Sequence, residues 1–139
     1  MNPAALKRRI ELRLTGQRRL VERLLEVRAQ LPGSLFARYG RCGKSGCSCA
    51  DGQGHGPYYV LSHRSGGRGS YAYLERGQVR KTREQVRRYR EFRTGLQRLQ
   101  QLNEELVELL RRYQEETAMR AGRALGLSNT KQEKQSYNN

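Results

Sequence analysis

Three cysteines and one histidine are the residues of this chain whose types and spacing could do chemistry. Cys42, Cys47 and Cys49 are spaced C-x4-C-x-C, and His55 follows after five further residues. Three thiolates and one imidazole are a common tetrahedral ligand set for zinc, and the intervening glycines allow the sharp turns by which four side chains converge. The pattern predicts a bound metal ion, with zinc as the expected cofactor. Two alternatives stay open: His63 replaces His55 as the fourth ligand, or the thiols bind no metal and His55 begins an ordinary turn.

A Gly-Lys-Ser triplet in the same stretch suggests a phosphate-binding loop, but the spacing argues against it. That motif places a glycine five positions before its Gly-Lys pair, whereas the residue five positions before Gly43 is Arg38. The motif also needs a strand that leads into a helix, and no helical pattern follows Ser45.

The same region offers little for catalysis. Its only carboxylates are Asp51 and Glu75, which are not spaced for acid–base or two-metal chemistry. A complete Cys3His set also leaves no open coordination position for water, as in structural zinc sites. We therefore expect a binding protein and not an enzyme.

The charge of the chain indicates what it binds. Its 139 residues include 28 Lys and Arg against 13 Asp and Glu, a formal net charge of +15, which favours polyanions such as DNA, RNA or an anionic membrane surface. The charge is unevenly placed, because residues 78–98 carry a net +6 and residues 99–118 a net −3. Most of the cations are arginines, whose guanidinium groups suit bidentate contact with phosphate.

We expect nucleic acid to lie along the basic residues of the glycine-rich region and of the helix that follows. Four arginines between positions 80 and 90 share one stripe of a helix at about 100° per residue, although a solvated helical face remains the alternative. Tyr58, Tyr59, Tyr71 and Tyr73 offer rings for stacking on unpaired bases, and one tyrosine of each strand is expected to face the core. The residues predicted to bind nucleic acid are Arg41, Lys44, Tyr58, Arg64, Arg68, Arg76, Arg80, Arg83, Arg87 and Arg90.

Two long segments have the three- and four-residue apolar spacing of amphipathic helices. In residues 4–31 the apolar stripe includes Leu24 and Val27 and is interrupted by Arg13 and Gln17. A proline–glycine pair at 32–33 is expected to end this helix.

The second long segment covers residues 78–125 and has an apolar position at every third or fourth residue from Val86 to Tyr113. A capping-box pattern at Thr82 allows a start there instead of at Gln78. We expect the stretches 4–31 and 86–113 to pack against each other, within one chain or across a homodimer.

Residues 33–77 contain 11 of the 15 glycines. Two β-prone runs, Tyr58–Leu61 and Tyr71–Leu74, flank Gly66-Gly67, which predicts a β-hairpin. Residues 35–39 are a candidate third strand.

The predicted fold is therefore α+β and mostly α, with two long antiparallel, coiled-coil-like helices that flank a small glycine-rich, zinc-stapled β-hairpin. We divide the chain into an N-terminal helix (1–32), the Cys/His module (33–77), a long basic-to-acidic helix (78–126) and a disordered polar tail (127–139).

The run "RCGKSGCSC…HGPYYVLS", followed by "YAYL" and an Arg-rich helix, resembles a family of short bacterial proteins of unknown function. The family signature is Arg-Cys-Gly-Lys-x-x-Cys-x-Cys and then His-Gly-Pro-Tyr-Tyr, and the resemblance spans residues 33–95. It implies that the whole Cys/His run is one functional unit and that the protein is encoded beside mobile-element genes.

Two functions follow from these observations. The first is a nucleic-acid-binding accessory protein, for DNA or RNA, that serves a mobile element. The second is a coiled-coil adaptor whose basic surface binds an acidic partner such as a recombinase or nuclease. The N-terminus has no apolar signal-peptide core, no run of about 18 apolar residues could span a membrane, and an odd number of clustered cysteines fits a reducing compartment. We therefore expect a cytoplasmic protein.

Overall fold

The structure is a computed structural model, and it describes residues 1–26 and 28–127. The described elements are two helices and three strands, as expected for an α+β chain: α1 (Pro3–Leu24), β1 (Ser34–Gly40), β2 (His55–Ser65), β3 (Arg68–Leu74) and α2 (Arg76–Ala124). The chain divides into two compact units. Of the described residues, the helical unit holds 1–24 and 97–127, and the sheet unit holds 25–96 without residue 27.

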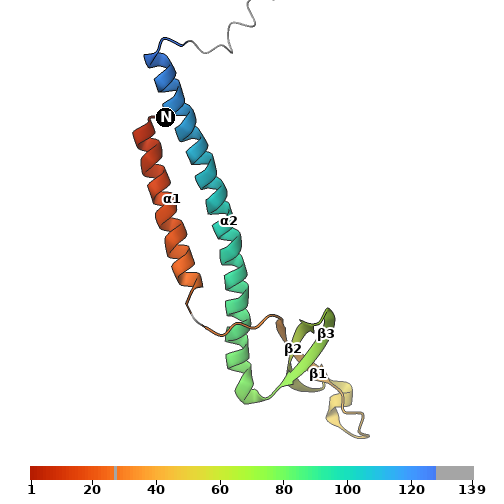
Figure 1. Ribbon diagram of the computed structural model, residues 1–139. Helices are drawn as coiled ribbons and strands as arrows, with labels where there is room; N and C mark the ends of the chain where they lie inside the picture. Colours follow the sequence, from red (N-terminus) through yellow and green to blue (C-terminus); the bar gives the residue numbers. More distant parts are fainter. Residues whose placement is uncertain (27, 128–139) are drawn as a thin grey trace, which may run out of the picture. The chain divides into compact units, whose positions relative to one another are not determined.

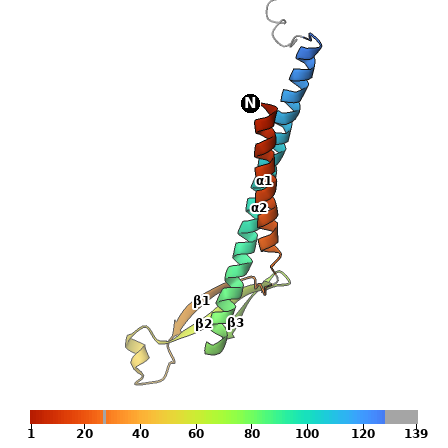
Figure 2. The same ribbon diagram turned by 90° about the vertical axis from the view of Figure 1, so that its left-hand side faces the viewer.

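In the helical unit, α1 lies antiparallel to the C-terminal half of α2, as both ribbon views show (Figures 1 and 2). Its core is a cluster of Leu6, Ile10 and Leu109, with Leu106 packed against it. At one end of the pair the N-terminal ammonium of Met1 lies 3.3 Å from the Glu116 carboxylate. The stripe at every third or fourth residue thus buries its leucines against a second helix, which neither helix could do alone.

A charged pair, Arg13 and Glu105, interrupts the apolar interface between α1 and α2, which we call the seam. Arg13 Nε lies 2.7 Å from Glu105 Oε2, and both side chains are about two-fifths exposed. The interruption that the sequence shows at Arg13 is therefore matched by an acid on the facing helix. Such a pair adds little stability at this exposure, but it disfavours registers in which either charge would face a leucine.

The sheet unit contains a three-stranded antiparallel sheet with the order β1-β2-β3. Gly66 and Gly67 form the tight turn between β2 and β3 with φ of 57° and 80°, a conformation in which two positive φ values favour glycine. On the central strand, Val60 pairs with Phe36 on one side and with Tyr73 on the other. The predicted hairpin and third strand are thus both present.

The helix bounds differ from those predicted. α1 ends at Leu24 and not at residue 31, since residues 28–33 run in irregular backbone toward β1 and the Leu31 N–H donates to the Gln85 carbonyl at 3.1 Å. Val27 and the predicted tail from residue 128 lie outside the described residues.

α2 begins at Arg76, before both predicted starts. The Gln78 side chain accepts a hydrogen bond from the Glu75 N–H at 3.0 Å, so the N-terminal cap is about two turns before the capping box predicted at Thr82. Thr82 instead lies buried inside the helix. The apolar stripe of α2 is divided between the units: Val86 is buried in the sheet unit, whereas Leu102 and Leu109 are buried in the helical unit.

Neither described helix combines the length and apolar character that crossing a membrane would need.

Candidate metal centre and basic cleft

The three cysteines and His55 converge on one point. Their ligand atoms all lie within 4.8 Å of one another. Sγ of Cys42 and Sγ of Cys49 are 3.4 Å apart, and Sγ of Cys47 is 3.3 Å from Nε2 of His55. In a tetrahedral zinc site with Zn–S near 2.3 Å, two sulfurs are about 3.8 Å apart and a sulfur and a nitrogen about 3.6 Å apart. The arrangement is compatible with a metal site such as zinc, as the spacing predicted.

The loop between β1 and β2 carries this cluster. A short 3-10 turn at Ser48–Asp51 places Cys49, which is the buried ligand of the four. The Cys42 N–H donates to Sγ of Cys49 at 3.4 Å, the kind of second contact that orients a thiolate ligand. Where the loop returns to the sheet, Gly54 has φ of 94° and a Cβ there would meet the Gly40 carbonyl oxygen at 2.6 Å.

Hydrogen bonds inside the cluster shift the pKa values of its groups. The Lys44 backbone, followed by the side chains of His55, Cys49 and Cys47, lowers the pKa of the Cys42 thiol from 9.0 to about 6. The backbone and the thiol of Cys49 also lower the pKa of Cys47. Cys42 and Cys47 therefore favour the thiolate, the form of cysteine that binds metal.

The pKa values of the other two groups move upward. For Cys49, the hydrogen bond from the Cys42 backbone lowers the pKa, but the Cys47 thiol, burial and the Cys42 thiol outweigh it and the pKa is raised. The thiols of Cys42 and Cys47 raise the pKa of His55 because they favour the imidazolium. Protons on these two groups would be released when a metal binds.

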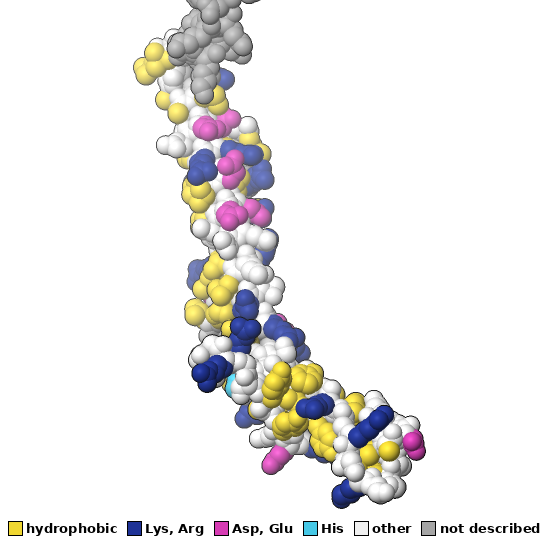
Figure 3. Space-filling view, turned by 90° about the vertical axis from the view of Figure 1, so that its right-hand side faces the viewer, with side chains coloured by type: hydrophobic (Ala, Val, Ile, Leu, Met, Phe, Trp, Pro, Cys, Tyr) yellow, Lys and Arg dark blue, Asp and Glu magenta, His cyan; other side chains and the backbone are white. Residues whose placement is uncertain are grey.

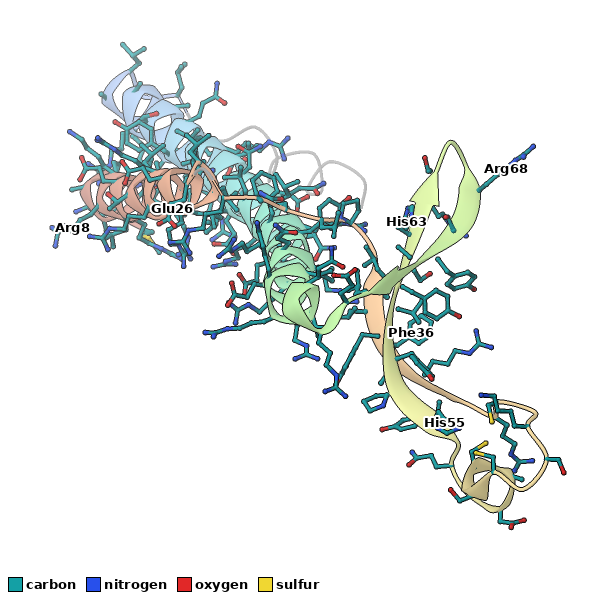
Figure 4. All side chains as sticks on the ribbon, turned by 90° about the horizontal axis from the view of Figure 1, so that it is seen from below. Arg8, Glu26, Phe36, His55, His63 and Arg68 are labelled. Atoms are coloured by element: carbon teal, nitrogen blue, oxygen red, sulfur yellow. The ribbon has the colours of Figure 1, made fainter. Side chains whose placement is uncertain are left out.

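The structure distinguishes between the two histidines. His55 is the first residue of β2 and belongs to the cluster, whereas His63 lies eight residues further along the same strand, opposite Ser70 near the hairpin turn. Figure 4 shows His55 beside the sulfur atoms and His63 at the other end of the strand. His63 is therefore not positioned to be the fourth ligand.

A cleft of about 370 Å³ lies in the sheet unit beside the start of α2. Arg83 stacks over the Tyr59 ring with its guanidinium carbon 5.8 Å from the ring centroid, a cation–π contact that holds the arginine in place. The N–H groups in the first turn of α2 add the positive end of the helix dipole. The residues that line the cleft are Pro57, Tyr59, Arg76, Val79, Arg80 and Arg83.

The other predicted nucleic-acid-binding arginines of α2 are exposed but have partners. Arg87 lies 3.5 Å from a Glu91 carboxylate oxygen, and Arg90 donates to the Ser34 hydroxyl at 3.1 Å. Exposed pairs of this kind are worth about 1 kcal/mol or less, so a phosphate could displace them. Four basic residues outside α2 are also predicted to bind nucleic acid, and all four are exposed. They lie on the loop between β1 and β2, which carries the Cys/His cluster, and on the β2–β3 hairpin: Arg41, Lys44, Arg64 and Arg68.

The prediction that one tyrosine of each strand faces the core is right for β2 and wrong for β3. Tyr71 and Tyr73 are two positions apart on β3 and therefore share a face of the sheet. By the register, Tyr58 lies on that face as well, and only Tyr59 lies on the opposite face, toward α2. The alternation of Tyr-Ala-Tyr in the sequence is the signal that shows this.

Fold and cluster together define a small α+β protein with a site that can hold a metal ion beside an arginine-lined cleft. A family model described as a domain of unknown function (DUF6788) matches residues 4–88. The chain belongs to this family, whose match includes α1, the sheet, the Cys/His cluster and the start of α2. No curated protein and no solved structure matches the chain.

Proposed function

We propose that this protein binds nucleic acid through its phosphate backbone and that a zinc ion at the Cys/His cluster holds the adjacent loop in its binding conformation. The observation that carries the proposal is the cleft at the start of α2. Three arginines line it, and the described sequence around it, residues 25–96 without residue 27, has 14 Lys and Arg against 5 Asp and Glu. Arginines that converge on one cleft fit the planar, bidentate geometry of phosphate contacts.

The positions of the cleft and the cluster support a joint role. Pro57 in the cleft lining comes two residues after the ligand His55 on the same strand. Arg41 and Lys44, which are exposed beside the ligand Cys42, would extend the basic surface once a metal ordered their loop. The zinc would be structural in this proposal, because four protein ligands fill a tetrahedral site and leave none for water.

The test compares binding of the protein to duplex and single-stranded 20-mers by fluorescence anisotropy over a series of salt concentrations. The variant Arg76→Gln/Arg80→Gln/Arg83→Gln removes three charges from the cleft. If each arginine neutralises one phosphate, the slope of log affinity against log salt should become shallower by about 2.7 on duplex DNA and by about 2.1 on single strands.

A matched control removes the same charge elsewhere. Arg8, Arg19 and Arg111 are exposed and lie in the helical unit, so Arg8→Gln/Arg19→Gln/Arg111→Gln should change the slope much less. Equal losses in the two triple variants would mean that binding follows total charge and that the cleft is not the site. Binding to polyglutamate as tight as binding to nucleic acid would favour the adaptor function instead.

The resemblance to proteins encoded beside mobile elements suggests the process that such binding would serve. We propose an accessory role in which the protein holds the nucleic acid of a mobile element for a larger enzyme. Sequencing the nucleic acid that copurifies from the native host tests this role, because the proposal requires enrichment of element sequence over the rest of the genome.

A further inference from the structure

We infer that the face of the β-sheet turned away from α2 is a stacking platform for the unpaired bases of a single-stranded nucleic acid. This inference rests on the proposed function and names the form of nucleic acid that the protein prefers. The platform consists of four aromatic rings and one arginine from all three strands: Phe36, Arg38, Tyr58, Tyr71 and Tyr73.

The register of the strands places these side chains on one face. Phe36 and Tyr73 are the direct partners of Val60, and Arg38 is the partner of Tyr58. Since residues that face each other across a ladder point the same way, and since residues two apart on a strand do so as well, Tyr71 joins the set. Figure 4 shows Phe36 on the side of the sheet that faces away from α2.

The rings are exposed in spite of their size. Tyr71 is 69% exposed, Tyr73 60%, Tyr58 49% and Phe36 40%, whereas Val60 between them is only 2% exposed. The rings thus shield the Val60 side chain from solvent, while the outer surfaces of the rings themselves stay exposed. An exposed apolar surface of this kind usually marks an interaction site.

Contacts among the platform residues hold the rings in place before any ligand arrives. Phe36 and Tyr71 meet edge to face, with ring centroids 6.4 Å apart and planes at 89°. Arg38 Nη1 donates to the Tyr73 hydroxyl at 2.8 Å, so that the guanidinium lies beside a ring on the same face. Preorganised rings lose less conformational entropy on binding than mobile ones do.

The charge of the sheet decides between possible occupants of this face. None of the three strands contains Asp or Glu, and by the register Arg38 and Arg64 lie on the platform face. In Figure 3 hydrophobic side chains gather over the sheet with Lys and Arg among them, while acidic side chains gather on the helical unit. Aromatic rings with cations and no acids are the composition by which proteins bind single strands, through base stacking and backbone attraction. Duplex DNA keeps its bases stacked inside the helix and cannot use the rings.

The test replaces two rings by a β-branched residue that suits an exposed strand. Each base stacked on an aromatic ring contributes about 5- to 150-fold to affinity, so Tyr71→Thr/Tyr73→Thr should bind a single-stranded 20-mer at least about 25-fold more weakly. Its affinity for duplex should change less than about 2-fold, because phosphate contacts elsewhere are unaltered. The matched control Tyr71→Phe keeps the ring and should bind single strands as the parent does. Circular dichroism and zinc content confirm that each variant is folded.

A second measurement uses the absence of tryptophan from the chain. Tyr71→Trp introduces a single indole on the platform, and stacking with a base should quench its fluorescence with single-stranded but not with duplex DNA.

Three outcomes decide the matter. Selective loss of single-strand binding in the Thr variant, with quenching in the Trp variant, supports the inference. Unchanged single-strand binding in the Thr variant, or equal loss on single strands and duplex, overturns the platform while leaving the phosphate-binding function intact. If the parent protein binds neither form in a salt-dependent way, the proposed function itself fails and the platform with it.

Discussion

Removing the metal should release the loop between Cys42 and His55 while the strands and helices stay folded. This stretch has 14 residues, of which only Cys49 is buried. Apart from the cluster itself, the 3-10 turn and the pairing of His55 with Gly40, its backbone is held by hydrogen bonds from the N–H of Cys47 to Lys44 and from the N–H of Ala50 to Cys47. Chelation of zinc from the purified protein is the perturbation, with Cys49→Ser as its genetic equivalent.

The magnitude follows from those few contacts. Fixing the backbone costs about 1 kcal/mol per residue at the low end of the usual range, so ordering the 14 residues costs about 14 kcal/mol. These few backbone bonds and one buried side chain return about 3 to 4 kcal/mol. The remaining cost of about 10 kcal/mol lies at the lower end of what structural zinc contributes in small zinc-binding peptides, about 10–16 kcal/mol. Without the ion, the hydrogen bonds and buried surface of the loop do not offset the conformational entropy lost on ordering it.

Elemental analysis and hydrogen–deuterium exchange measured by mass spectrometry are the assays. The protein purified under reducing conditions should contain one zinc per chain, and after chelation the amides of residues 42–54 should exchange fully within seconds. Amides in β2 beyond Tyr58 and in α2 should keep their protection. Ser45→Ala, an exposed change in the same loop, should alter neither zinc content nor exchange. A loop that stays protected after the metal is stripped, or a protein without stoichiometric metal, would refute the reasoning.

Three further predictions concern the ligands and the helical seam. His55→Asn should weaken zinc binding at least tenfold in a chelator competition, whereas His63→Asn should leave it unchanged; the opposite result would assign the fourth ligand to His63. Zinc affinity measured in the same way should fall as the pH is lowered from 8 to 6, because the pKa values of Cys49 and His55 are raised and protons compete with the metal on both; a flat profile would contradict the assigned ligands. Leu6→Asp buries an unpaired charge at a side chain that is 1% exposed and should lower Tm by roughly 10 °C or more, while Leu12→Asp, at a position 68% exposed, should melt like the parent.

The sequence predicts the convergence of the Cys/His cluster and the sheet well because both depend on local patterns. Cysteine and histidine spacing limits which side chains can converge, and Gly66-Gly67 between two β-prone runs leaves few alternatives to a tight turn. The assignment of the rings to faces is right for β2 but wrong for β3, although the information was present, since the Tyr-Ala-Tyr alternation of β3 puts both tyrosines on one side.

The helix ends could not be predicted from local patterns because contacts far along the chain set them. α1 ends at Leu24 although apolar spacing continues, since Leu31 is held by the backbone of α2 at Gln85. Likewise the charge of Arg13 interrupts the seam in the sequence, but only the structure identifies Glu105 as its partner. Nucleic-acid binding, the homodimer and the mobile-element partner stay predictions.

The base of the metal loop has a consequence for how such proteins could be altered. β1 ends at Gly40 and β2 begins at His55, its ladder partner, and Gly54 packs directly against the Gly40 backbone. The loop therefore leaves the sheet at the end of β1 and re-enters it at the facing residue of β2, so that its two ends are adjacent. Residues 41–53 could vary in length and chemistry between homologues, or be exchanged by an engineer for another metal-binding or peptide-binding loop, without shifting the strand register. This tolerance should end at Gly54, because a side chain there would clash with the Gly40 carbonyl oxygen and force the ends of β1 and β2 apart.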